Sequence, residues 1–321
     1  MSIALLMFNF NENEGVITNI ELMMDIVDEI LILDSSNNEN FGALMLKYKD
    51  IDKIKILRVF PTGYPDPFVG YALKHIKSKY VFRLDSDEEP NLNLINWLKN
   101  FNEDNDISGF NILRYEKQLK CFDYQIRFFL KNSVEYKGMI HEFPSLPDAK
   151  RLDDGKYIIH EADFMTYVNK RKSYLLIEAY DRPFSIFYLS TQSRFFKVFR
   201  NEDKILPKYL VYISTFLLFL RRSLSYSSIK LRGYRYNLFL MKYTINRYAY
   251  FIQLENRHEI VKINKDIIKN GGIIKYLNLD NSDYVEKLTK NFNWQKNGIE
   301  IFSELIEYKY RYGFVCHLIL H

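Results

Sequence analysis

The first hundred residues alternate short apolar runs with stretches whose apolar residues recur at helical spacing. The apolar runs are SIALLMF, EILILD, KIKILRVF and KYVFRLD, and residues 15–29 and 69–77 carry the helical spacing. Strands that alternate with helices predict a parallel sheet with crossover helices. We predict a further helix at 91–102, strands in FNILRYEK, YQIRFFLK and KYIIH, and a mostly helical chain beyond residue 165.

Polar side chains follow three of these apolar runs. Asn11 and Glu12 follow the first run, Asp34 and Ser35 the second, and Asp85 and Asp87 the run that begins at Tyr80. In open α/β sheets, ligands bind at the edge formed by the carboxyl ends of the strands. These polar clusters therefore predict a ligand site at that edge. With 47% apolar and 26% charged residues, the chain has the composition of a folded globular protein.

Asp85 and Asp87 lie two residues apart at the end of an apolar strand, and they therefore project from the same face. A hard divalent cation relieves the repulsion between two such carboxylates, and Mg²⁺ completes its shell with substrate phosphates. We predict that Mg²⁺ or Mn²⁺ binds here and neutralises a diphosphate leaving group. The alternative is a solvated acidic turn, since Glu88, Glu89 and Pro90 follow.

Four motifs in this order resemble the inverting GT-A glycosyltransferases of family 2, in particular the branch that contains the lipopolysaccharide-core glucosyltransferases. The resemblance covers about residues 1–165. The motifs are Phe10-Asn11-Glu12, Leu33-Asp34-Ser35, the Asp-x-Asp strand from Tyr80 to Glu88, and Asp123-Tyr-Gln-Ile-Arg127 followed by Tyr136-Lys-Gly-Met-Ile-His-Glu142. The fold that the resemblance implies is α/β, with a GT-A-like (Rossmann-like) nucleotide-sugar-binding domain at 1–165 and a mostly helical C-terminal region at 166–321.

The resemblance also implies roles for individual residues around a nucleoside-diphosphate sugar. Asn11 and Glu12 help to form the nucleotide pocket, and Asp34 accepts a hydrogen bond from the base or ribose. A turn-forming Asp is the alternative for Asp34. The family's Lys-Asn-x-Ala pattern is replaced here by Val-Gly-Tyr-Ala at 69–72, so Arg83 or Lys74 is expected to take over the diphosphate or ribose contact.

The metal site and the catalytic base follow from the same resemblance. Asp87 is the principal metal ligand, Asp85 contacts ribose or metal-bound water, and His160 completes the metal shell; a structural strand-end histidine is the alternative for His160. An inverting transfer needs a base for the acceptor proton. Glu142 is the first candidate, Asp123 and Glu161 are its rivals, and a salt bridge to Arg127 is the alternative role.

The segment 205–254 contains eight Lys or Arg and no Asp or Glu, and its positive charge exceeds the net charge of +5 of the whole chain. Its apolar stretch ILPKYLVYISTFLLFL is shorter than the ~20 residues of a spanning helix. Basic and aromatic residues at helical intervals suit a helix that lies in the headgroup plane of an anionic membrane. Core helices with a solvated basic face are the alternative, and a nucleic-acid surface has no recognition motif to support it.

These observations lead to one expected function and two alternatives. We expect a metal-dependent, inverting glycosyltransferase that acts on a lipid-linked or cell-surface glycan acceptor, peripheral on the cytoplasmic face of the membrane. Cys121 and Cys316 fit no disulfide or metal framework, and the N-terminus has no secretory pattern. The alternatives are a catalytically weak binding or scaffold protein of the same fold and a basic nucleic-acid-binding protein. The sugar, the nucleotide base and the oligomeric state are left open.

Overall fold

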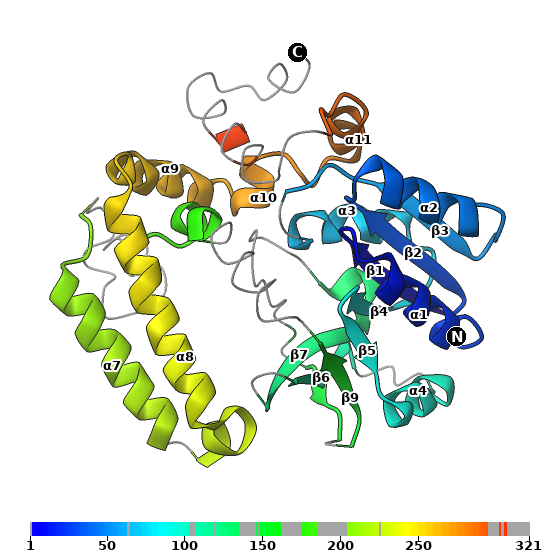
Figure 1. Cartoon of the computed structure of the whole chain (residues 1–321), viewed down its shortest axis with the longest axis horizontal. Coiled ribbons are helices and arrows are strands. Elements are labelled where there is room, and N and C mark those ends of the chain that lie inside the picture. Colours follow the sequence, from blue (N-terminus) through cyan, green and yellow to red (C-terminus); the bar gives the residue numbers. More distant parts are fainter. Residues whose placement is uncertain are drawn as a thin grey trace.

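The computed structural model describes most of the chain. The described residues are 2–62, 65–102, 107–117, 120–134, 146, 148–153, 155–161, 175–184, 204–224, 226–294, 302 and 305–306, without the side chains of 121, 222, 226–236 and 239. They form a mixed α/β structure in which a curled sheet is packed against helices (Figure 1).

One half of the sheet consists of four parallel strands in the order β3-β2-β1-β4. These strands are β1 (Ile3–Asn9), β2 (Glu29–Asp34), β3 (Ile54–Arg58) and β4 (Tyr80–Asp85), and the connecting helices are α1 (Asn13–Met23), α2 (Asn38–Tyr48) and α3 (Val69–His75). The predicted alternation of strands and helices is thus confirmed for this half. Because β2 lies on one side of β1 and β4 on the other, the strand order reverses between β1 and β4. Such a reversal opens a crevice at the carboxyl ends of the two strands.

The other half of the sheet is largely antiparallel. Strand β7 (Cys121–Leu130) pairs with β4 and with β6 (Gly109–Glu116), and β9 (Tyr157–His160) joins β6 to the short edge strand β5 (Glu88–Pro90). The two-residue strand β8 (Lys150–Arg151) also pairs with β6. The predicted strands at FNILRYEK, YQIRFFLK and KYIIH are confirmed. Strand β5 is not a solvated turn, because Glu88 and Pro90 are buried and the strand pairs with β9.

Alternate side chains of β1 enter two different cores, one on each face of the sheet. Ile3, Leu5 and Met7 pack with α1, with α2 and with α4 (Leu92–Lys99). Ala4, Leu6 and Phe8 pack on the opposite face, in the cluster that includes α3. A strand covered on both faces reads as a continuous apolar run, which is the pattern of SIALLMF.

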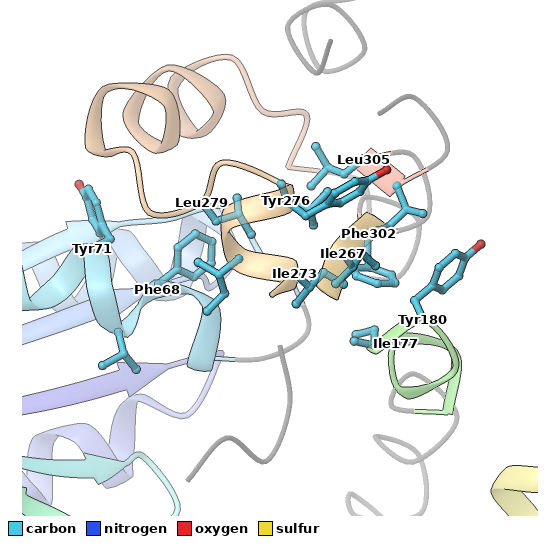
Figure 2. Packing of buried hydrophobic residues seen from close by; sticks show 14 of the residues in the cluster. Phe68, Tyr71, Ile177, Tyr180, Ile267, Ile273, Tyr276, Leu279, Phe302 and Leu305 are labelled. Atoms are coloured by element: carbon cyan, nitrogen blue, oxygen red, sulfur yellow. The ribbon is translucent and has the colours of Figure 1, made fainter. Parts of the chain in front are cut away.

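The C-terminal helices complete the second core. They are α9 (Arg257–Lys269), α10 (Ile273–Tyr276) and α11 (Ser282–Lys290), and Figure 2 shows Leu279, just after α10, close to Phe68 beside α3. The members of this hydrophobic cluster are spread along the chain, from Ala4 in β1 to Ile306. The N-terminal sheet and the helices near the end of the described chain therefore share a core.

Two longer helices form a hairpin at the side of the molecule. Helix α7 (Lys208–Leu224) packs along α8 (Tyr226–Gln253), and α8 in turn contacts β7. In Figure 1 the hairpin stands apart from the parallel strands, with α7 at the outer edge. No helix in the described part of the chain combines the length and the apolar character that crossing a bilayer requires.

Candidate functional site

The loops that follow β1 and β2 are joined by a buried carboxylate. Asp34 is fully buried; its Oδ2 accepts a hydrogen bond from Asn9 Nδ2 at 2.6 Å, and its Oδ1 accepts one from the backbone N of Ser36 at 2.8 Å. Burial raises the pKa of Asp34, and the hydrogen bonds from Asn9 and Ser36 oppose that rise. Oδ2 thus joins the ends of β1 and β2, while Oδ1 orders the loop that follows β2. The contact of Asp34 with a base or ribose stays a prediction.

Asn11 links the same two loops on the surface. Its backbone has φ = 60°, a left-handed conformation that Asn tolerates better than most residues. Its Oδ1 accepts hydrogen bonds from the backbone N of Asn37 at 3.0 Å and from Asn40 Nδ2 at 3.1 Å, at the start of α2. Asn11 therefore orders the loop that precedes α1 and lies at the edge where a nucleotide is predicted.

Arg58, at the end of β3, was not among the predicted site residues. Its Nη2 donates a hydrogen bond to Asn38 Oδ1 at 2.6 Å, and its guanidinium lies 3.5 Å from the ring centre of Trp294 and 4.5 Å from that of Phe41. The rule that selected Asp34 does not select Arg58, which lies inside the apolar run KIKILRVF and ends a strand only in the structure. Trp294, which follows α11, could be placed beside Arg58 only by the tertiary structure.

Glu12 and Ser86 meet across the crevice between β1 and β4. Ser86 Oγ donates a hydrogen bond to Glu12 Oε2 at 2.5 Å. Helix α1 approaches this turn so closely that a Cβ on Gly15 would lie 1.9 Å from the carbonyl oxygen of Ser86. The structure thus brings together the first and third of the predicted polar clusters.

Asp85 is held by two arginines. Its Oδ2 accepts a hydrogen bond from Arg127 Nη2 at 3.0 Å, and its Oδ1 lies 3.5 Å from Arg83 Nη2. Burial acts to raise the pKa of Asp85, but the charges of Arg127 and Arg83 outweigh it and hold that pKa well below its usual range. Arg83 also pairs with buried Asp66 at 2.8 Å. Asp85 is thus ionised and oriented by the protein itself.

Glu88 is the main site residue that the sequence reading missed. Its side chain is fully buried, its Oε1 lies 2.6 Å from Arg127 Nη2 and 2.5 Å from Arg114 Nε, and its Oε2 accepts a hydrogen bond from the backbone N of Asp85 at 3.0 Å. Removing one member of such a buried ion pair leaves an uncompensated charge. Glu88 therefore fixes the turn that carries Asp85 and Asp87. The sequence did not indicate that Glu88 is buried, because an acidic residue directly after Asp-x-Asp is typical of a solvated turn.

His160 lies between two carboxylates. Its Nε2 is 3.1 Å from Asp87 Oδ2, and its Nδ1 is 2.6 Å from Glu116 Oε2. Burial acts to lower the pKa of His160, but the hydrogen bonds to Asp87 and Glu116 outweigh it and raise the pKa to about 9. The structure brings His160 next to Asp87, since β9 pairs with both β5 and β6.

The donor set at this turn fits a divalent cation only in part. In the described part of the chain, no group of three or more His, Cys, Asp or Glu side chains could hold a metal ion. Asp87 and His160 supply one carboxylate and one imidazole, whereas the oxygens of Asp85 face arginines. Because Mg²⁺ commonly binds through one or two carboxylates plus substrate phosphates, two protein donors are enough if a diphosphate supplies others. The ligand roles of Asp85, Asp87 and His160 stay predictions.

The site lies in a network of ion pairs in which five carboxylates meet three arginines and His160. The members are Asp66, Asp85, Asp87, Glu88 and Glu116 against Arg83, Arg114 and Arg127. Burial raises the pKa of Glu88, and the charges of Arg127 and Arg114 oppose that rise.

The candidate bases are spread over different places. Glu142 lies outside the described residues. Asp123 begins the Asp-x-Gln-x-Arg motif on β7, opposite Arg114, and the next residue of that motif, Gln125, accepts a hydrogen bond from Arg127 Nε at 3.0 Å. Since alternate residues of a strand share a face, Asp123 lies on the face of the ionic network. Glu161 is exposed and pairs with Lys117.

Lys74, the alternative to Arg83 for the diphosphate contact, donates a hydrogen bond to the carbonyl oxygen of Asp280 instead. Asp280 directly precedes α11, which begins at Ser282. Arg83, by contrast, contacts Asp85 within the network. The structure thus favours Arg83 over Lys74 as the residue near the predicted diphosphate.

No protein-family model matches the chain, and its sequence matches no curated protein. Among solved structures, it is similar to S. aureus TarS (12% identity, TM-score 0.35, covering 82% of this chain and 55% of that one) and to TarS 1-349 in complex with UDP (11%, 0.35, 83% and 92%). It is also similar to HddC from Yersinia pseudotuberculosis (11%, 0.36, 54% and 100%). Likeness of this degree assigns neither fold nor function, which rest here on the chain's own topology and side chains.

Proposed function

We propose that this protein transfers a sugar from a nucleoside-diphosphate sugar to a hydroxyl group of a glycan acceptor. The observation that carries the proposal is the pair Asp87–His160 beside the Glu12–Ser86 hydrogen bond, at the point where the strand order reverses. Polar groups on both sides of that reversal point suit a ligand with a nucleoside at one end and a charged diphosphate at the other.

In this proposal, each side of the crevice has a separate task. The loops ordered by Asn11, Asp34 and Arg58 bind the nucleoside, and Asp87 with His160 holds Mg²⁺ or Mn²⁺ against the diphosphate. The cation supplies neutralisation of the leaving group. Asp85 and Arg127 keep the turn in place between these two parts.

The acceptor side of the reaction follows the sequence prediction. Glu142 or Asp123 takes the proton from the acceptor hydroxyl, whose oxygen attacks the anomeric carbon while the bond from that carbon to the diphosphate breaks, and this single displacement inverts the carbon. Asp123 lies on the same face of β7 as Gln125, which contacts Arg127. A lipid-linked or cell-surface glycan precursor at the cytoplasmic face of the membrane is the proposed acceptor.

A thermal-unfolding screen tests the proposal. A nucleoside diphosphate with Mn²⁺ should stabilise the folded protein by about 2.7 kcal/mol at one hundred times its Kd, and less without the metal. Transfer from the nucleotide sugar whose diphosphate binds best should then be detectable. Stabilisation by nucleotide sugars without hydrolysis or transfer would indicate a binding protein of this fold. No response to any nucleotide, together with salt-sensitive binding of DNA or RNA, would contradict the proposal.

A further inference from the structure

Helix α7 exposes an unusual number of large apolar side chains. Eight of them contact water, namely Tyr209, Leu210, Ile213, Phe216, Leu217, Leu218, Leu220 and Leu224. Elsewhere in the described part of the chain, only Phe10, Leu46, Ile51 and Leu92 are large, apolar and comparably exposed, and they are scattered. Concentration of such side chains on one helix marks a binding surface, whereas scattered ones need no explanation.

The exposed side chains form a stripe on the side of α7 that faces away from the protein. At about 100° per residue, seven of them, all but Leu218, fall within an arc of roughly 120°. Val211 and Thr215 lie on the other side of the helix and are buried, and Tyr212 contacts the ring of Tyr248 on α8. A helix in a globular protein normally buries its apolar stripe. Here α8 covers the other side of α7, and Figure 1 shows α7 outermost.

The charges around the stripe identify its partner. Lys204 and Lys208 are exposed before its first residues and Arg221 near its end, and the segment 205–254 has no acidic residue. An apolar stripe with cationic residues at its margins is the pattern of a helix that lies in the interface of a bilayer. Basic residues near an anionic leaflet are attracted within a Debye length.

We propose that α7 binds an anionic membrane in the plane of its surface, with the stripe from Tyr209 to Leu224 inserted at the boundary between headgroups and acyl chains. The sequence places membrane contact anywhere in 205–254, and among the described side chains of that segment the exposed large apolar ones all lie on α7. The stripe spans about 22 Å along the helix axis. Membrane binding through α7 is independent of the proposed nucleotide site.

Co-sedimentation of the full chain with vesicles tests this proposal. We expect binding to phosphatidylcholine vesicles that contain about one third phosphatidylglycerol, and weaker binding at high salt. The triple variant Ile213→Ser, Phe216→Ser, Leu217→Ser should lose at least ~10-fold in affinity, because it removes the centre of the inserted surface. The control Leu46→Ser, Leu92→Ser removes two leucines from α2 and α4 that are more exposed than the three substituted residues of α7, and it should bind as the wild type does.

A second measurement reports the position of the helix directly. In a Phe216→Trp variant, lipids brominated on their acyl chains should quench the added fluorescence, while the native Trp97 and Trp294 give an unquenched background. Wild-type affinity in the triple variant, or no quenching, would overturn the proposal. A full chain that is dimeric, becomes monomeric in the triple variant and does not bind vesicles would also overturn it, by assigning the stripe to self-association. The triple variant should keep its thermal shift with nucleotide, which separates this test from that of the proposed function.

Discussion

Around Glu88, charged side chains are taken out of water and meet partners of opposite charge, whereas along α7 eight large apolar side chains are left in water. Both arrangements are costly for a folded chain, since buried charge is desolvated and exposed apolar surface is hydrated. At the β4–β5 turn the cost is offset inside the protein by Arg114 and Arg127. On α7, it would be offset by an external partner. The two regions thus differ in what offsets the unfavourable free energy: ion pairs within the protein in one, an external partner in the other. Variants in each region can measure this difference.

The largest effect is expected at Asp87, whose proposed partner is also external to the chain. Asp87→Asn should reduce transfer to background, because the cation at a diphosphate supplies several kcal/mol in the transition state. Some thermal stability should be lost as well, since His160 loses one of its two carboxylate partners. Steady-state transfer assays with added Mn²⁺ and with excess chelator measure this. The matched variant Asp153→Asn changes an exposed carboxylate and should be active. Full activity in chelator would contradict the metal-dependent mechanism.

The next largest effect concerns the acceptor proton. Glu142→Gln should retain nucleotide-induced stabilisation and lose transfer by ~10²–10⁴-fold, since a positioned base contributes that much to rate. Single-turnover transfer and thermal shift, measured together, separate chemistry from binding. The rival assignment predicts the same signature for Asp123→Asn. If Asp123→Asn alone shows it, the base is Asp123.

Removal of the internal compensation at the turn should affect stability. Glu88→Gln leaves Arg114 and Arg127 without their shared carboxylate, and we expect a loss of about 3–5 kcal/mol in the free energy of unfolding. Denaturant unfolding measures it. Glu89→Gln, one residue further and exposed, is the matched control and should be near neutral. Equal stability of the two variants would show that the buried network contributes nothing to the fold.

The close approach of α1 to the turn can be tested with alanine. Gly15→Ala places a Cβ 1.9 Å from the carbonyl oxygen of Ser86 and should destabilise the protein by about 1–3 kcal/mol, because the backbone must move. Gly42→Ala, in the interior of α2 with nothing within 4 Å, should stabilise it by up to ~1 kcal/mol. Opposite signs in thermal unfolding are the expected result. A stabilising Gly15→Ala would contradict the described packing of α1 on Ser86.

The smallest effect is expected from a single charge beside the stripe. Arg221→Gln should weaken binding to anionic vesicles by about fivefold, which corresponds to ~1 kcal/mol for one basic residue near the leaflet. Binding to neutral vesicles should be unchanged, as the apolar stripe is intact. Vesicle titration at two salt concentrations measures both. Equal losses with neutral and anionic lipids would show that Arg221 supports the structure of α7 instead of contacting headgroups.

Sequence patterns predicted the parallel half of the sheet well, because strands covered on both faces are continuous apolar runs. They also selected Asn11, Asp34, Asp85 and Asp87, since strand ends are recognisable wherever apolar runs stop. The rule missed Arg58, because Val59 and Phe60 continue the apolar run beyond the end of β3. The burial of Glu88, the residue after Asp87, was not predictable. A run of acidic residues is typical of a solvated turn, and only the pairing of β5 with β9 buries this one.

The sequence by itself determined the order of strands and helices, the polar strand ends and the absence of acidic residues from 205–254, because periodicity and charge are local properties. Only the tertiary structure decided which polar groups meet. Long-range pairing places His160 between Asp87 and Glu116, brings Arg127 to both Asp85 and Glu88, and sets Trp294 against Arg58. It also decided which side of α7 stays exposed, since the packing of α8 on one side, and not the helical pattern alone, leaves the stripe in water.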